Sequence, residues 1–265
     1  MGKVYLIGAG PGDPELLTVK AARLLERATI LLHDSLVSRE VLQMIPRQAE
    51  IIDVGKRCGQ KLLTQDEINA LLVSYAANHE AVIRLKGGDP VVFGRAGEEI
   101  EALRRANVPF EIVPGITAAL GAAAAAGISL TDRRVASQIV ITTYSRGSDV
   151  GATDPFAVTP QLDWAAISSS TTLVLYMPGA DYAEVSRRLR EAGQPENLPC
   201  VIVSNATTPN QQIRWTTVGG LAAEAKLAAP ALLIVGRVAT HEIQEIAATN
   251  WRSESPEPKA HPMIS

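Results

Sequence analysis

The chain has 265 residues, a formal net charge of −3 and 46% apolar side chains, enough to bury a sizeable core. This charge balance argues against general binding of nucleic acids or anionic membranes. Cys58 and Cys200 are too few for a disulfide framework, so we expect free thiols and a cytoplasmic protein. The longest run of low polarity, Ile116–Leu130, is too short to span a bilayer, and the first apolar run, Val4–Ala9, is unlike a signal peptide.

The first half of the chain alternates predicted strands and helices. This alternation predicts an α/β domain with a mainly parallel sheet and helices on both faces. Thr64 followed by Glu67 has the pattern of a capping box and predicts a helix start. The alanine run 122–126 between two glycines predicts a closely packed helix near a domain junction. The expected strands are Val4–Gly8, Thr29–His33, Ile51–Val54, Ala81–Leu85 and Phe110–Val113, and the expected helices are Leu16–Arg27, Ser38–Met44, Gln65–Ala77, Gly97–Ala106 and Ile116–Ala126.

In the second half of the chain, the apolar runs are rich in β-branched residues, which are typical of strands. Together with two predicted helices, they indicate a second, mixed α/β domain. The polar, Gly- and Pro-containing stretch Ser145–Gln161 predicts a mobile loop, and prolines among charges near the end of the chain predict disorder. We therefore expect an N-terminal domain over 1–115, a C-terminal domain over 116–245 and a disordered tail over 246–265. The expected strands are Gln138–Thr142, Thr172–Met177, Pro199–Val203, Ile213–Val218 and Leu232–Val235, and the expected helices are Ala183–Glu191 and Leu221–Ala228.

Two glycine-rich segments follow predicted strands. In the second, Arg84–Arg95, the pair Gly87 and Gly88 removes side chains where the backbone must turn or a ligand must approach closely. Asp89 then places an acceptor at the end of the strand. Ligands of open α/β sheets bind outside the carboxyl ends of the strands. Taken alone, this segment is equally consistent with a tight turn that binds nothing.

The first glycine-rich segment, Gly8–Thr18, does not fit the nucleotide-binding templates. A dinucleotide fingerprint needs G-x-G-x-x-G that opens directly into a helix. Here Pro11 and Pro14 are expected to hold the loop extended, and Pro11 has no N–H for an anion. Neither segment is followed by the Lys-Ser or Lys-Thr of a P-loop. The two segments together favour another small ligand.

Taken together, the segments resemble the S-adenosylmethionine-dependent uroporphyrinogen III C-methyltransferases of the tetrapyrrole methylase superfamily. The resemblance runs from about Lys3 to Ala239 and implies the two-domain tetrapyrrole methylase fold and a homodimer. Asp34–Val37 with Gly55–Arg57 is more particular to this branch than the motifs shared across the superfamily. The matching segments are Gly8–Asp13, Leu16–Ala21, His33–Val37, Val54–Arg57, Arg84–Arg95, Gly97–Glu99, Val113–Thr117, Tyr176–Met177 and Pro230–Gly236.

The resemblance implies transfer of methyl groups from S-adenosylmethionine to two pyrrole carbons of uroporphyrinogen III, without a metal. The product would be precorrin-2, for sirohaem or cobalamin synthesis. Methyl transfer from a sulfonium is an in-line displacement by a pyrrole β-carbon, after which a proton must be shed elsewhere to restore conjugation. The resemblance points to Asp34 as proton acceptor and Lys56 as proton donor, and which is acid and which is base stays open. Taken alone, Asp34 fits a turn residue or helix cap equally well, and Lys56 fits an exposed strand-end lysine better.

Uroporphyrinogen III is a polycarboxylate, so we expect its pocket to be locally basic. A guanidinium can bind a carboxylate through two hydrogen bonds, although an arginine taken singly is more often a solvated surface residue. Asp89 could bind a ribose hydroxyl or the methionine amino group, and Met177 could pack against adenine. The candidate substrate ligands are Arg57, Arg84, Arg95 and Arg133. The cofactor contacts that the resemblance implies are Pro11, Gly87, Gly88, Asp89, Val92, Thr117, Ala118, Met177 and Ala206.

Four positions depart from the residues usual in the family. Asp132 and Tyr144 stand where histidines are usual, His33 where tyrosine is usual, and Ala206 where glycine is common. A new carboxylate facing a polyanion would oppose binding by like-charge repulsion. If the neighbouring arginine binds substrate, Asp132 must therefore point away or pair with a cation such as Arg134.

These departures leave two alternatives open. One is a sister methylase that acts on a later corrin intermediate or on another substrate, and the motif pair Asp34–Val37 and Gly55–Arg57 argues against it. The other is a cofactor-binding protein that has lost turnover, and the intact Asp34 and Lys56 argue against that.

Overall fold

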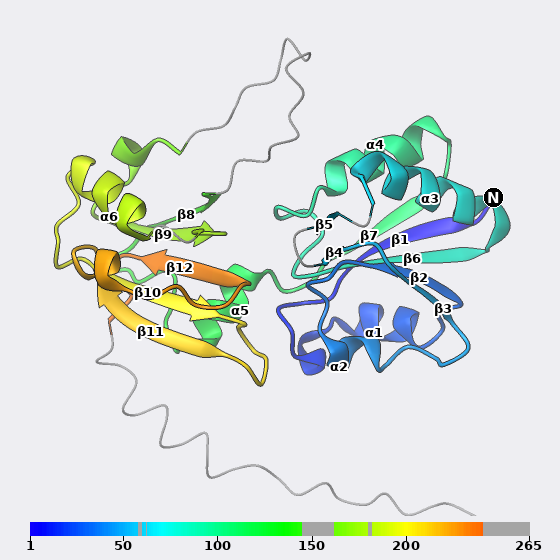
Figure 1. Ribbon diagram of the computed structural model, residues 1–265, viewed down its shortest axis with the longest axis horizontal. Coiled ribbons are helices and arrows are strands. Elements are labelled where there is room, and N and C mark those ends of the chain that lie inside the picture. Colours follow the sequence, from blue (N-terminus) through cyan, green and yellow to red (C-terminus); the bar gives the residue numbers. More distant parts are fainter. Residues whose placement is uncertain (58–59, 62, 145–161, 180–181, 241–265) are drawn as a thin grey trace, which may run out of the picture.

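The computed structural model describes residues 1–57, 60–61, 63–144, 162–179 and 182–240, with the backbone alone at positions 56–57, 60–61 and 166. The expected loop Ser145–Gln161 and the expected tail 246–265 lie outside these ranges, as does Cys58. The described chain forms two five-stranded sheets, one from residues 3–113 and one from residues 138–235 (Figure 1). In these ranges, no helix combines the length and apolar character that crossing a membrane requires.

The first sheet is parallel throughout and has the strand order β3-β2-β6-β1-β7. Helices cover both of its faces, α1 and α2 on one and α3 and α4 on the other (Figure 1). The parallel α/β sheet predicted from the alternation of elements is thus confirmed. Its strands are β1 (Lys3–Gly8), β2 (Ile30–His33), β3 (Glu50–Asp53), β6 (Ala81–Lys86) and β7 (Phe110–Val113), and its helices are α1 (Val19–Leu25), α2 (Arg39–Leu42), α3 (Gln65–Asn78) and α4 (Ala96–Arg105).

The pleat of β6 separates two sets of side chains. Ile83 and Leu85 pack in the core under α1, whereas Val82 packs in the core under α3 and α4. Because side chains alternate between the faces of a strand, Arg84 and Lys86 lie on the same face as Val82. Two basic residues are therefore placed under α3 and α4, in the middle of an apolar layer.

The predicted capping box at the start of α3 is confirmed. The Thr64 N–H donates to Glu67 Oε2 at 2.6 Å, and the Glu67 N–H donates to Thr64 Oγ1 at 3.2 Å. Each side chain satisfies a backbone donor that the first helical turn leaves free. The hydrogen bonds from Thr64 lower the pKa of Glu67, because they favour its ionised carboxylate.

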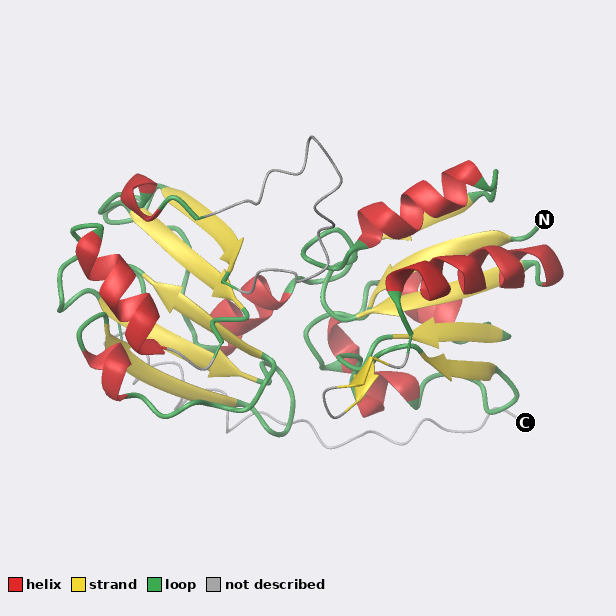
Figure 2. Cartoon of the chain, turned by 45° about the horizontal axis from the view of Figure 1, so that its top comes forward, coloured by secondary structure: helices red, strands yellow, loops and turns green. Residues whose placement is uncertain are grey.

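The second sheet is mixed and has the order β11-β10-β12-β9-β8, with β8 and β9 parallel and the remaining pairs antiparallel. One face packs against α6 and the other against α5, which lies where the two domains meet (Figures 1 and 2). The elements are α5 (Ala118–Ala125), β8 (Gln138–Thr143), β9 (Thr171–Tyr176), α6 (Tyr182–Glu191), β10 (Pro199–Ser204), β11 (Gln212–Thr217) and β12 (Ala231–Val235). Outside both sheets lie the hairpin of β4 (Lys56–Arg57) and β5 (Gln60–Lys61) and the short 3-10 turns η1 (Pro14–Leu16), η2 (Trp164–Ala166) and η3 (Gly220–Ala223).

The predicted strands are all present, with ends that shift by about one residue, but one helical prediction is wrong and another is too long. The helix expected over Leu221–Ala228 is only the turn η3, because the chain beyond it is tied to the sheet, where Ser204 Oγ donates to the Ala228 carbonyl. The helix expected over Leu16–Arg27 begins at Val19, after an extended Thr18 that caps it.

The prediction that Pro14 holds its loop extended is also wrong. Pro14 instead opens the turn η1, where a proline loses no needed hydrogen bond. The Asp13 carboxylate accepts the Glu15 N–H at 2.9 Å and so caps this turn.

Candidate active site

The two glycine-rich loops meet at the carboxyl ends of the neighbouring strands β1 and β6. Their backbones exchange two hydrogen bonds, from Gly10 N to Gly88 O at 3.1 Å and from Gly88 N to Gly10 O at 2.8 Å. Both residues have positive φ angles, 71° and 68°, a conformation that glycine adopts without steric cost. The loops that the sequence predicts as a ligand site are therefore side by side.

Asp89 ties the loop after β6 to the loop after β7. Its Oδ1 accepts the Val91 N–H at 2.9 Å, and its Oδ2 accepts the Gly115 N–H at 3.1 Å. Each carboxylate oxygen has a further lone pair for a ligand donor. Asp89 thus combines a structural role with an acceptor suited to a ribose hydroxyl or an amino group.

Tyr176, at the end of β9, joins the second domain to this site. Its hydroxyl accepts the Ala119 N–H at 2.8 Å and hydrogen-bonds Thr117 Oγ1 at 2.5 Å, and its ring packs against Phe93 with centroids 5.0 Å apart. Burial raises the pKa of Tyr176, so the phenol keeps its proton and can donate at neutral pH. Phe93 belongs to the loop after β6, and this ring contact therefore bridges the two domains.

A second bridge is formed by the loop after β1. Asp13 N donates to Thr207 Oγ1 at 3.2 Å, and a Cβ placed on Gly121 would lie only 2.6 Å from Pro11 Cβ. This loop therefore packs against both α5 and the loop after β10. We call the meeting place of these strand-end loops and the start of α5 the interdomain junction.

The predicted cofactor residues lie on the strand-end loops and the helix start around the interdomain junction. A Cβ on Gly88 would have only ordinary contacts, 3.6 Å from Ala118 N and 3.9 Å from Thr117 Cα, so there is space beside Gly88. Met177 is 47% exposed and offers an apolar surface, whereas Ala206 is buried and can present only its backbone. Apolar surface, backbone groups and the Asp89 carboxylate fit a ligand that carries an adenine, a ribose and an amino acid. These residues are Pro11, Gly87, Gly88, Asp89, Val92, Thr117, Ala118, Met177 and Ala206.

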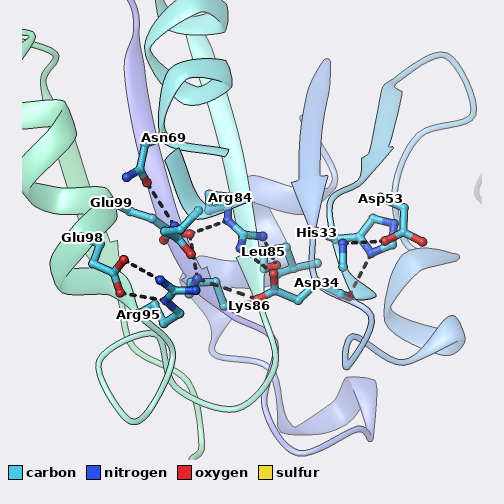
Figure 3. Close-up of polar contacts among 12 residues, drawn as sticks. His33, Asp34, Asp53, Asn69, Arg84, Leu85, Lys86, Arg95, Glu98 and Glu99 are labelled. Carbon is cyan, nitrogen blue, oxygen red and sulfur yellow. Dashed lines mark hydrogen bonds and ion pairs between the residues drawn. The ribbon is translucent and has the colours of Figure 1, made fainter. Parts of the chain in front are cut away.

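Asp34, directly after β2, is the exposed end of a cluster of four charged side chains (Figure 3). Arg84 Nη2 donates to Asp34 Oδ1 at 2.5 Å, and Lys86 Nζ lies 3.8 Å from Asp34 Oδ2. Both cations also donate to one oxygen of Glu99, from Arg84 Nε and Lys86 Nζ at 2.9 Å each. Burial alone would lower the pKa of Arg84, but Glu99 and Asp34 more than offset this and raise it.

The structure places Arg84 away from the expected role of a substrate ligand. It is 1% exposed, and its guanidinium is bound to protein carboxylates. The physical reason is the pleat of β6, which directs this side chain under α4.

Lys56 comes close to Asp34 through the backbone. A Cβ on Gly55 would overlap Ser35 N, so the segment that leads into β4 packs directly against the residue after Asp34. Asp53 Oδ1 accepts the Gly55 N–H at 2.9 Å and shapes this turn. The side chains of Lys56 and Arg57 lie outside the described atoms.

Of the other predicted arginines, the two whose side chains the structure describes, Arg95 and Arg133, are exposed at the surface. Arg95 has a positive φ of 56° and binds both carboxylate oxygens of Glu98, at 2.8 and 2.7 Å. Arg133 is exposed in the turn between α5 and β8.

The structure shows how two departures from the family's residues are accommodated. Asp132 binds Arg134 at 2.6 and 3.0 Å, and these hydrogen bonds lower the pKa of Asp132 to about 2. The expectation that Asp132 pairs with Arg134 is confirmed. His33 is nearly buried, and its Nδ1 lies 3.0 Å from the backbone carbonyl oxygen of Asp34.

Lys86, Glu99 and Tyr176 were assigned no role from the sequence. The sequence did contain a signal for Lys86, because Arg84 and Lys86 alternate with apolar residues in a strand that is otherwise apolar. No signal distinguished buried Glu99 from exposed Glu98, since both carboxylates lie in the first turn of α4. Among the described residues, no group of three or more His, Cys, Asp or Glu side chains could hold a metal ion.

Two α/β domains with glycine-rich strand-end loops at their junction define the class of protein to which this chain belongs. It is a member of the tetrapyrrole (corrin/porphyrin) methylase family, whose sequence model matches residues 3–222. The chain is 46% identical over 261 residues to the uroporphyrinogen-III C-methyltransferase of Paracoccus denitrificans, covering 95% of this chain and 88% of that protein.

Two further comparisons extend this result. Identity to the siroheme synthase of Methylobacillus flagellatus is 45% over 261 residues, covering 97% of this chain but only 53% of that longer protein. The uroporphyrin-III C-methyltransferase of Thermus thermophilus, solved with S-adenosylhomocysteine, superposes with a TM-score of 0.75 at 37% identity. That match covers 89% of this chain and 93% of the solved one, and it confirms the two-domain tetrapyrrole methylase fold.

Proposed function

We propose that this protein is an S-adenosylmethionine-dependent C-methyltransferase that methylates two pyrrole carbons of uroporphyrinogen III to give precorrin-2. The observation that carries the proposal is the position of Asp34 beside the glycine pair. A Cβ on Gly87 would lie 2.9 Å from Leu36 Cβ, so the loop that bears Asp34 packs against Gly87. An acid–base carboxylate and a ligand loop thus adjoin at the carboxyl edge of one sheet.

The cofactor is proposed to bind at the interdomain junction. S-adenosylmethionine would supply an electrophilic methyl group there. Asp89 accepts a ribose hydroxyl or the methionine amino group, Met177 packs against the adenine, and Gly88 leaves room for the ligand. The arrangement holds the ligand in place for an in-line displacement, in which positioning supplies much of the rate.

The substrate is proposed to lie over Asp34 and Lys56. Once a ring carbon has been methylated, the macrocycle must lose a proton from another position to restore conjugation. Asp34 takes that proton, and Lys56 supplies a proton to the tetrapyrrole. Arg57, Arg95 and Arg133 bind substrate carboxylates, while Arg84 acts on Asp34. The proposal includes a cytoplasmic location, which the low cysteine content supports, and a homodimer, which rests on the family resemblance.

The test is a methyl-transfer assay with purified protein, uroporphyrinogen III and methyl-labelled S-adenosylmethionine. We expect two labelled methyl groups per macrocycle. Binding of S-adenosylhomocysteine without label transfer to uroporphyrinogen III would overturn the proposal. Label transfer to a later corrin intermediate alone would replace it with the sister-methylase alternative.

A further inference from the structure

Figure 3 shows the charge cluster of Asp34, Arg84, Lys86 and Glu99, of which only Asp34 is appreciably exposed. The Asp34 side chain is 29% exposed, whereas those of Arg84, Lys86 and Glu99 are 2%, 3% and 0% exposed. The cluster thus consists of three buried charged side chains and one carboxylate that solvent can reach. We propose that Glu99 is a positioning residue that holds Arg84 and Lys86 and offsets half of their charge, so that Asp34 remains an effective proton acceptor. This inference rests on the proposed function.

The geometry makes Glu99 the centre of the cluster. Its Oε1 accepts a hydrogen bond from Arg84 Nε and another from Lys86 Nζ, both at 2.9 Å. The same two cations face the two oxygens of Asp34, one each. Glu99 reaches Asp34 only through these cations, and so acts on it by fixing where they lie.

The charge balance explains why a carboxylate is needed at this position. The cluster contains two cations and two carboxylates, which compensate one another in a region largely shielded from water. Without the charge of Glu99, two cations would face Asp34 alone and would hold it in its ionised form more strongly. A carboxylate whose ionised form is stabilised in this way binds a proton less tightly and is therefore a weaker base.

A buried ionic cluster is by itself weak evidence of a contribution to stability. Removing charges from water is costly, and replacing a buried ionic group with apolar residues of similar volume is often neutral or stabilising. Glu99 also carries a cost of its own, because its Oε2 is buried without a hydrogen-bond partner among the described residues. What the cluster achieves in spite of these costs is to place Arg84 and Lys86 beside Asp34.

The test compares Glu99→Gln with Glu101→Gln. Glutamine at position 99 keeps the shape and one acceptor but removes the charge, whereas Glu101 lies on the same helix, is exposed and pairs with Arg105. For Glu99→Gln we expect kcat to fall on the order of tenfold or more. We expect the acid limb of the kcat–pH profile to move to lower pH and the affinity for S-adenosylhomocysteine to stay unchanged. Glu101→Gln should behave as the wild type in all three measurements.

A second variant is expected to shift the titration of Asp34 in the opposite direction. Lys86→Met removes one cation and leaves Glu99 to offset Arg84, so the Asp34 carboxyl should titrate at a higher pH than in the wild type. The carbon-13 chemical shift of the Asp34 carboxyl, followed against pH, measures both shifts without any turnover. Titration that is unchanged in Glu99→Gln, or that moves in the same direction in both variants, would overturn the inference. Failure of the wild type to methylate uroporphyrinogen III would overturn the proposed function while leaving the two titration shifts to decide the role of Glu99.

Discussion

The Tyr176 hydroxyl, at the end of a strand of the second sheet, hydrogen-bonds Thr117 Oγ1 at 2.5 Å, where helix α5 begins. The Thr117 side chain makes no capping hydrogen bond to its own helix, and the Ala119 N–H is satisfied by the Tyr176 hydroxyl instead. The strand β9 therefore fixes the start of α5. Since Thr117 and Ala118 are proposed cofactor contacts, this link joins the core of the second domain to the ligand site.

We expect Tyr176→Phe to lower the free energy of unfolding by about 1–3 kcal/mol, because the Ala119 N–H and the Thr117 hydroxyl lose a partner. Urea denaturation measures the change. The control is Tyr75→Phe, which removes an exposed hydrogen bond to Glu50 and should cost no more than about 0.5 kcal/mol. Equal costs in the two variants would show that the Tyr176 hydroxyl does not fix α5.

Gly88→Val should severely weaken binding of S-adenosylhomocysteine, measured by calorimetry. The φ of Gly88 is 68°, which a β-branched residue adopts only with strain, and the new side chain would enter the space beside Ala118. Gly193→Val is the matched control, because Gly193 also has a positive φ, 83°, but nothing lies within 4 Å of its added Cβ. Unchanged affinity in Gly88→Val would remove the glycine pair from the cofactor site.

Replacing Asp34 or Lys56 with alanine should lower turnover far more than cofactor affinity. General acid–base groups typically contribute on the order of 10²–10⁴-fold, and each residue is proposed to act on the tetrapyrrole. Single-turnover rates and S-adenosylhomocysteine affinities, measured in parallel, separate the two effects, with exposed Lys226→Ala as the control. A loss of affinity as large as the loss of rate would assign these residues to the cofactor site or to structure.

Asp132→His should leave substrate affinity equal or improve it, with the largest gain at mildly acidic pH, where imidazole gains a proton. The pKa of Asp132 is about 2, so its carboxylate stays ionised and paired with Arg134 across the pH range of the assay. Histidine removes that negative charge and adds a positive one as the pH falls. Substrate titration at two pH values measures the effect, and a sharp loss of activity would instead give Asp132 a role of its own in substrate preference.

Much of the fold could be predicted from local sequence patterns. Runs of β-branched residues marked the strands, and Thr64 with Glu67 marked the start of α3, because hydrogen bonds within a few residues decide such features. The helix expected over Leu221–Ala228 failed where a contact distant in sequence, from Ser204 to Ala228, took precedence. Local preference decides an element only where tertiary contacts do not compete with it.

The candidate site divides in the same way. The sequence by itself determined that two glycine-rich loops follow strands, and parallel pairing of β1 with β6 then brings Gly10 and Gly88 together. It is the three-dimensional packing that buries Arg84 and binds it to Asp34 and Glu99. This position depends on which face of β6 is covered by α4 and on which of two adjacent glutamates that helix turns inward. Such choices are made by the packing of whole elements against one another, and no local pattern encodes them.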